Sequence, residues 1–188
     1  MVIMPLTSTF DDAPQHNHPS GGLPSSVASR GEGQWHLQGT GLFRWSVFRV
    51  YEASLFVQAP LSTEAIADCF DELPTFALVL NYLRNVSAAQ IASTSVSEMI
   101  RLRNVDPVVA AQWGQQMAEL LPNVSLGDKL IGLFKPGQGV VFYANATELG
   151  EVADTTFVSA FASVWLDPNT KAPALRASLL GLQNEALS

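Results

Sequence analysis

The stretch from Gly39 to Val57 constrains the fold most, because it is long, rich in β-branched and aromatic residues, and free of proline. Such residues fit a pleated, half-buried surface, so we expect one long strand or a strand pair that bends near Trp45 and Ser46. Side-chain alternation puts a guanidinium and a phenol on one face with aliphatic groups: Val47, Arg49, Tyr51, Ala53, Leu55 and Val57.

This mixed face has two interpretations. It fits the wall of a pocket that holds an apolar molecule with a polar end. It also fits an ordinary sheet edge, where the Arg49 side chain reaches water and the Tyr51 ring packs in the core. The alternation pattern by itself favours ordinary packing, so further residues are needed to decide.

Composition bounds the class of protein. With 188 residues and 47% hydrophobic content, the chain can form one domain with a sizeable core. The formal net charge is −7, only 10 residues are Lys or Arg, and they form no cluster. We therefore expect no nucleic-acid partner and no electrostatic docking to an anionic membrane. No run approaches the ~20 apolar residues of a membrane span, so no integral membrane association is expected either.

The first residues have a different composition. Residues 1–32 are rich in Pro, Ser, Gly, His and Asp and lack a hydrophobic period, which predicts a disordered tail before a domain over 33–188. No signal peptide is recognisable, so the chain is expected to be soluble and cytoplasmic, or periplasmic if the true start lies upstream. The single cysteine, Cys69, excludes an internal disulfide and a cysteine-based zinc site, and no metal or cofactor is expected. The oligomeric state stays open.

Local signals predict an alternation of strands and helices. Strands are expected over 34–43, within 39–57, and over 76–83, 129–135, 139–144 and 147–149. A helix capped by Ser62 or Thr63 is expected to reach Phe70. Longer helices are expected after the caps Ser87, Asp106 and Asp154, and over 173–180 before Gly181. This order predicts an α+β fold with an antiparallel sheet and helices against one face.

Common catalytic motifs are missing. The chain has no Gly-x-Ser-x-Gly, no His-Glu-x-x-His and no Gly-x-Gly-x-x-Gly after a strand. His36, the one histidine within the predicted domain, is interpreted as structural. The polar side chains expected to reach a pocket are Arg44, Arg49 and Tyr51, with Tyr82 and Tyr143 from other strands.

Several separate motifs resemble the bacterial chalcone isomerase-like family. They are Arg44-Trp45, Val50-Tyr-Glu-Ala-Ser-Leu-Phe56, Leu121-Pro-Asn-Val-Ser-Leu-Gly-Asp128, Val164-Trp-Leu-Asp-Pro-Asn-Thr-Lys171 and Leu175-Arg-Ala-Ser-Leu-Leu-Gly181, in the family's order over about residues 34–182. The resemblance implies an open-faced β-sandwich, in which a layer of helices covers a large antiparallel sheet and a cleft lies between them.

The resemblance also implies several functions. The family's plant enzymes cyclise chalcones to flavanones, and other branches bind fatty acids through an Arg and a Tyr without catalysis. By position, the strand threonine of the plant enzymes falls at Tyr51, and their late Ser/Thr contact falls at Ser163. Their helical Tyr and Asn fall near Ser87 and Thr94, so neither residue type is kept. Their catalytic arginine falls near Gly39, with Arg44 as an approximate stand-in.

Three hypotheses follow. The first is a non-catalytic binder of a small apolar or amphipathic ligand such as a fatty acid, with Arg44, Arg49, Tyr51 and Ser163 as binding residues. The second is an isomerase (an intramolecular lyase) acting on an enone or chalcone-like substrate, in which an arginine stabilises an enolate and a phenol moves a proton. The third is a structural or accessory protein with a vestigial cleft. The missing Tyr and Asn count against chalcone cyclisation, and no catalytic residue is assigned.

Overall fold

The computed structural model describes residues 22–59, 62 and 70–182. Six antiparallel strands form one sheet in the order β1-β2-β3-β4-β5-β6, so each strand pairs with its neighbours in the chain. The strands are β1 (His36–Trp45), β2 (Phe48–Val57), β3 (Phe76–Tyr82), β4 (Lys129–Lys135), β5 (Gly139–Ala144) and β6 (Thr147–Val152). The predicted antiparallel sheet is confirmed.

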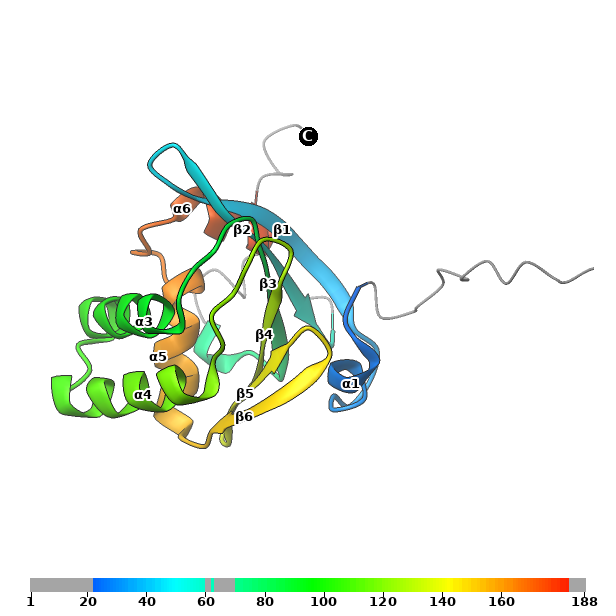
Figure 1. Ribbon diagram of the computed structural model, residues 1–188. Helices are drawn as coiled ribbons and strands as arrows, with labels where there is room; N and C mark the ends of the chain where they lie inside the picture. Colours follow the sequence, from blue (N-terminus) through cyan, green and yellow to red (C-terminus); the bar gives the residue numbers. More distant parts are fainter. Residues whose placement is uncertain (1–21, 60–61, 63–69, 183–188) are drawn as a thin grey trace, which may run out of the picture.

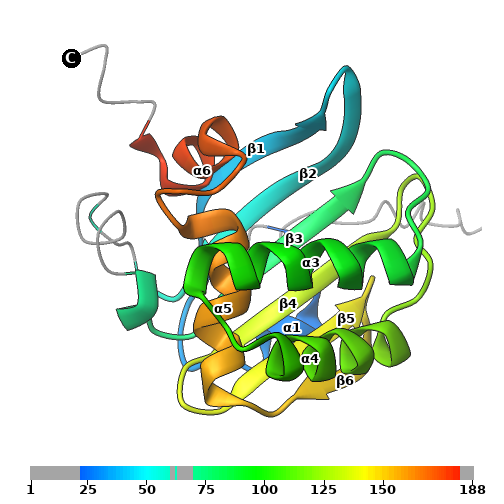
Figure 2. The same ribbon diagram turned by 90° about the vertical axis from the view of Figure 1, so that its left-hand side faces the viewer.

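Within the described residues, four helices cover one face of the sheet, as Figure 1 shows for their arrangement. They are α3 (Ala88–Arg103), α4 (Pro107–Leu120), α5 (Thr155–Leu166) and α6 (Pro173–Leu180). Figure 2 looks onto this layer and shows α3 and α5 crossing in front of the strands, with α6 over β1 and β2. The open-faced α+β arrangement predicted from the sequence is therefore confirmed. No helix within the described residues is long and apolar enough to cross a membrane.

The caps of these helices are the ones predicted. The Ser87 hydroxyl accepts from the Gln90 backbone N–H, and the Gln90 side chain accepts from Ser87 N–H, so α3 begins with a full capping box. Asp106 and Asp154 accept backbone N–H groups at the starts of α4 and α5. Gly181 ends α6 at φ 75°, a left-handed conformation that glycine adopts without strain.

The stretch from Gly39 to Val57 is a strand pair, the second of the two alternatives. Trp45 and Phe48 face each other across a two-residue turn in which Ser46 has φ 55°. Pairing of β2 with β3 starts only at Tyr51 and Tyr82. The end of the β1–β2 hairpin therefore extends past the rest of the sheet, as Figures 1 and 2 show.

The main core lies between the sheet and the helix layer. Ala53, Leu55 and Val57 of β2 are fully buried in it, as the alternation of this strand predicted. Aromatic rings from β4 and α5 fill the middle, with the Phe157 and Phe161 rings stacked at 5.0 Å and Phe134 stacked on Phe161 at 5.7 Å. Ring contacts of this kind fix the helix layer on the sheet.

A smaller core covers part of the opposite face. The short helix α1 (Ser25–Ala28) lies there, away from α3–α6 (Figure 1). Leu23, Val27 and Trp35 are buried in a cluster with apolar residues of β2–β5, and Trp35 Nε1 donates to the Ala28 carbonyl at 3.0 Å. Arg30 forms an ion pair with Glu148 at 2.5 Å.

Residues 22–32, which we expected to belong to the tail, thus pack against the sheet. Their apolar side chains are too few and too irregularly spaced to show a hydrophobic period. Residues 1–21 lie outside the described residues, so a disordered tail remains a prediction for them. The predicted helix ending near Phe70, with Cys69, also lies outside them, apart from a 3₁₀ turn over Phe70–Glu72.

Candidate functional site

Two arginines lie opposite each other near the end of the hairpin. Arg44 on β1 and Arg49 on β2 are register partners, and both side chains are exposed. Neither takes part in an ion pair with any residue that the structure describes. Like charges placed directly across two strands repel each other, so an anion between them would remove an unfavourable interaction.

Tyr51 lies two residues along β2 from Arg49, but a register shift between the Phe43–Tyr51 and Arg44–Arg49 pairs leaves Val50 unpaired between them. The alternation of faces is broken at this bulge, so the two arginines and Tyr51 are neighbours along the ladder on opposite faces of the hairpin. The Phe43 ring stacks on it at 4.9 Å and the Tyr82 ring meets it edge-on at 5.6 Å. Trp165 Nε1, from α5, donates a hydrogen bond to Tyr51 Oη at 3.1 Å. We call these four residues the Tyr51 cluster; it joins β1, β2, β3 and α5.

Both tyrosines of the cluster are uncharged at neutral pH. Burial raises the pKa of Tyr51 well above its usual 10.0, and the hydrogen bond from Trp165 only partly offsets this. Burial also raises the pKa of Tyr82, and the nearby Tyr51 adds to the effect. Tyr51 Oη accepts from Trp165, and no described residue accepts its own proton. The Tyr51 hydroxyl can therefore donate to an additional acceptor such as a carboxylate.

Ser163 is not brought together with these groups. It is fully buried in α5, and its hydroxyl donates to the Ala160 carbonyl of the same helix at 2.6 Å. Tyr143 is also remote, because it lies in the smaller core on the opposite face of the sheet. Of the residues predicted to form a site, Arg44 and Arg49 thus lie together near the hairpin turn, Tyr51 and Tyr82 lie together in the Tyr51 cluster, and Ser163 and Tyr143 lie apart from both.

The positions that the plant enzymes use for catalysis are occupied differently. A Cβ added at Gly39 would lie 2.1 Å from the Ser178 carbonyl oxygen, so the backbone of α6 fills the space of any side chain there. Ser87 is committed to the capping box of α3, and Thr94 is exposed. An arginine, a phenol and an amide are therefore all missing from the places where the resemblance would put them.

Hollows on the described surface lie elsewhere. One is an open groove of about 750 Å³ where the α3–α4 turn meets the start of α5, lined among others by Arg103, Asp106 and Trp113. Arg103 there bonds to Asp71 and to Ser159. Another, of about 190 Å³, lies over β1–β4 and includes Glu52 and Lys129. Neither is lined by Arg44, Arg49, Tyr51 or Ser163, and the sequence patterns had indicated neither.

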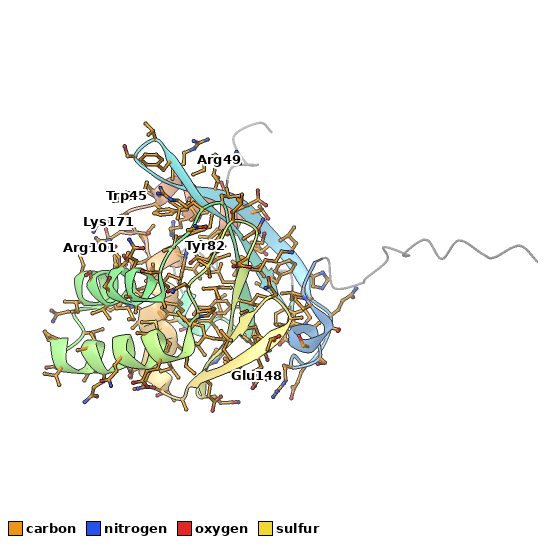
Figure 3. All side chains as sticks on the ribbon, in the orientation of Figure 1. Trp45, Arg49, Tyr82, Arg101, Glu148 and Lys171 are labelled. Atoms are coloured by element: carbon orange, nitrogen blue, oxygen red, sulfur yellow. The ribbon has the colours of Figure 1, made fainter. Side chains whose placement is uncertain are left out.

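A nearly buried carboxylate on α3 has a structural role. Glu98 pairs with Arg101 at 2.6 Å and with Lys171 at 2.5 Å, and Arg101 also donates to the Asn169 carbonyl. Burial raises the pKa of Glu98, but the hydrogen bonds from Arg101 and Lys171 outweigh it and hold the pKa below its usual value. This network ties α3 to the α5–α6 connection. Figure 3 labels its two cationic residues, Arg101 and Lys171. No metal-binding cluster of His, Cys, Asp and Glu occurs among the described residues.

Comparison with known proteins identifies the class of protein that this fold represents. The sequence profile of the chalcone isomerase-like family matches residues 22–181, and the chain belongs to that family. An uncharacterized protein of Haemophilus influenzae is 29% identical over 147 residues, which cover 78% of this chain and 68% of the relative. The crystal structure of a fatty-acid binding protein of Arabidopsis thaliana has a similar fold. Its TM-score is 0.62 at 11% identity, over 78% of this chain and 86% of that one.

Proposed function

We propose that this protein binds a small amphipathic carboxylate, such as a fatty acid, without transforming it. The observation that carries the proposal is the Arg44–Arg49 pair, which has no acidic partner among the described residues and is next in the β1–β2 ladder to the Phe43–Tyr51 pair. Two neighbouring guanidinium groups supply the charge-assisted donors that a carboxylate requires.

The expected affinity is divided between the two ends of the ligand. Because both arginines are exposed, each contributes about 0.2–1 kcal/mol rather than the value of a buried pair. The tail contributes about 0.8 kcal/mol for each buried CH₂ group. Phe43 and Tyr51, the next pair along the ladder, are only partly buried at the margin of the main core, and we infer that the tail packs beside their rings.

The comparisons support a binding role at the level of the fold. The Arabidopsis protein of similar fold is a fatty-acid binding protein, and at 11% identity the likeness to it is one of fold alone. The assignment to this chain therefore depends on its own hairpin and on direct measurement.

Catalysis of the chalcone isomerase type has less support from the residues. Tyr51 has a strongly raised pKa, so its phenol is poorly suited to exchange a proton near neutral pH. Gly39 leaves no space for an arginine while α6 is in place. An isomerase, and a structural protein with a vestigial cleft, remain as outcomes of the test.

The test is to purify the protein from its native host without detergent and to analyse it by native mass spectrometry. A co-purifying carboxylic acid, together with a thermal shift on adding C12–C18 acids to stripped protein, is expected. The Lys135→Gln variant is the control, because Lys135 lies at the end of β4 far from the hairpin turn. A spectrum of unliganded protein with no thermal shift would favour a vestigial cleft, and consumption of an enone above the buffer rate would favour an isomerase.

A further inference from the structure

The turn of the β1–β2 hairpin exposes large apolar side chains to solvent. Trp45 is 71% exposed, Val47 78% and Phe48 54%. Leu126 is 70% exposed and lies at the same end of the sheet. Its neighbour Gly127 fixes this position, because the Gly127 N–H donates to the Tyr82 carbonyl at the end of β3. Contiguous exposed apolar groups of this kind usually mark an interaction surface.

The same turn is basic, although the chain as a whole is acidic. Arg44 and Arg49 flank the apolar residues, and the Arg84 guanidinium lies over the Phe48 ring at 4.9 Å from its centroid. Residues 33–51 and 73–97, which contain these arginines, include no Asp or Glu, whereas the net charge of the chain is −7. The hairpin turn itself is thus positive and aromatic; acidic side chains begin only below it, with Glu52 after Tyr51 and Asp128 beside the end of β3.

We propose that this hairpin end docks on a lipid bilayer that contains anionic lipids. Arginines pair with phosphate groups of anionic lipids, and tryptophan favours the boundary between headgroups and acyl chains. Trp45 and Phe48 are paired partners in the hairpin ladder, so the turn can enter this boundary with few backbone groups left unpaired.

The shape of the molecule makes this docking compatible with its negative charge. The hairpin end extends past the other strands and the helix layer in Figures 1 and 2, and Figure 3 shows Trp45 and Arg49 on this extension. The screening length at physiological ionic strength is about 8 Å. The arginines can therefore contact headgroups while repulsion of the acidic body is largely screened. The expectation from net charge alone, that the protein avoids anionic membranes, does not take this positive turn into account.

A bilayer fits this surface better than another protein does. A stable protein interface buries roughly 1,000 Å² or more, and a narrow turn offers few side chains for it. In a dimer formed through this end, Arg44, Arg49 and Arg84 of one copy would face the same three arginines of the other copy and repel them. Docking does not depend on the proposed ligand; if both hold, the carboxylate site lies at the membrane surface from which an amphipathic acid is taken.

The fluorescence of Trp45 tests the proposal directly. Trp35, Trp113 and Trp165 are at most 6% exposed, so Trp45 is the only tryptophan at the surface. The full chain is mixed with phosphatidylcholine vesicles that contain or lack 30% phosphatidylglycerol, with bromine on the acyl chains as a quencher. We expect co-sedimentation and quenching with the anionic vesicles. In Trp45→Phe the quenching is lost, while binding is only reduced.

Variants outside the proposed ligand site separate the two proposals. Val47→Asp is expected to reduce vesicle binding at least tenfold, and Arg84→Gln about fivefold. Leu37→Asp is the matched control, because Leu37 is 51% exposed but lies near the start of β1, at the other end of the sheet. Circular dichroism confirms that each variant is folded. Equal binding of Val47→Asp and Leu37→Asp, or no binding of the native chain to anionic vesicles, would overturn the proposal. So would a dimer that Val47→Asp abolishes.

Discussion

Replacing Tyr51 by Phe should destabilise the protein, because its hydroxyl accepts the indole N–H of Trp165. Trp165 is only 6% exposed, so the mutation leaves a buried donor without its acceptor. Losing an acceptor in this way costs about 1–3 kcal/mol. Because the Tyr51 ring itself is partly exposed, water can replace part of the lost bond, and we expect about 1–2 kcal/mol. In a domain of this size, that lowers the melting temperature by about 2–8 °C.

A double-mutant cycle isolates this hydrogen bond. Tyr51→Phe, Trp165→Phe and the double variant are compared by urea unfolding, and a coupling free energy of about 1 kcal/mol is expected. Tyr82→Phe is the matched control, since Tyr82 packs in the same cluster but its hydroxyl has no hydrogen bond with a described residue. If Tyr51→Phe costs no more than Tyr82→Phe, or the coupling energy is zero, the Tyr51 cluster does not hold β2 and α5 together as described.

Three further perturbations follow from the packing. Gly39→Ala should lower the melting temperature, because the new Cβ would meet the Ser178 carbonyl of α6 at 2.1 Å. Gly33→Ala adds a Cβ that meets no atom, so its effect on the melting temperature measures only the backbone strain at φ 120°. A chain that starts at residue 22 should melt within about 2 °C of the full chain, whereas one that starts at 33 should lose more than about 5 °C. The longer deletion removes Leu23 and Val27, each worth about 1.5–3 kcal/mol when buried. Glu98 has a lowered pKa, so its stabilising effect is present above its usual pKa of 4.5 and is lost as the pH falls through the lower folded value. Urea unfolding at pH 6 and pH 3 should therefore show a smaller loss of stability for Glu98→Gln than for the native chain.

The elements that the sequence predicts well are those with local signals. The caps of α3, α4 and α5 need only a few neighbouring residues, and the structure confirms each of them. The strands expected over 129–135 and 139–144 were also placed correctly, and the turn between them contains Gly137 at φ 77°. Capping and turn formation depend on short-range hydrogen bonds, so they can be inferred without knowledge of the tertiary fold.

Contacts between distant segments could not be inferred in the same way. Tyr51 and Trp165 are 114 residues apart, and no periodic pattern links a strand position to one helix position. The packing of Gly39 against Ser178 is equally non-local. The helix α1 has only four residues and no amphipathic repeat, so its burial against the sheet left no signal. Alternation placed Arg49 on the face of Tyr51, but a register shift at Val50 separates their faces, and no pattern showed that β3 pairing ends at Tyr51 and leaves both hairpin arginines exposed.

The most direct test of the binding account compares two ligands that have the same tail and different heads. Isothermal titration calorimetry is performed with dodecanoate and with 1-dodecanol, both below the concentration at which they form micelles or aggregates. The difference between the two binding free energies is the contribution of the carboxylate. The native chain and Lys135→Gln should bind dodecanoate about tenfold more tightly, a difference of about 1.4 kcal/mol. The double variant Arg44→Gln/Arg49→Gln should bind both ligands equally. Equal affinity of the native chain for acid and alcohol, or a preference that survives the loss of both arginines, would contradict the account.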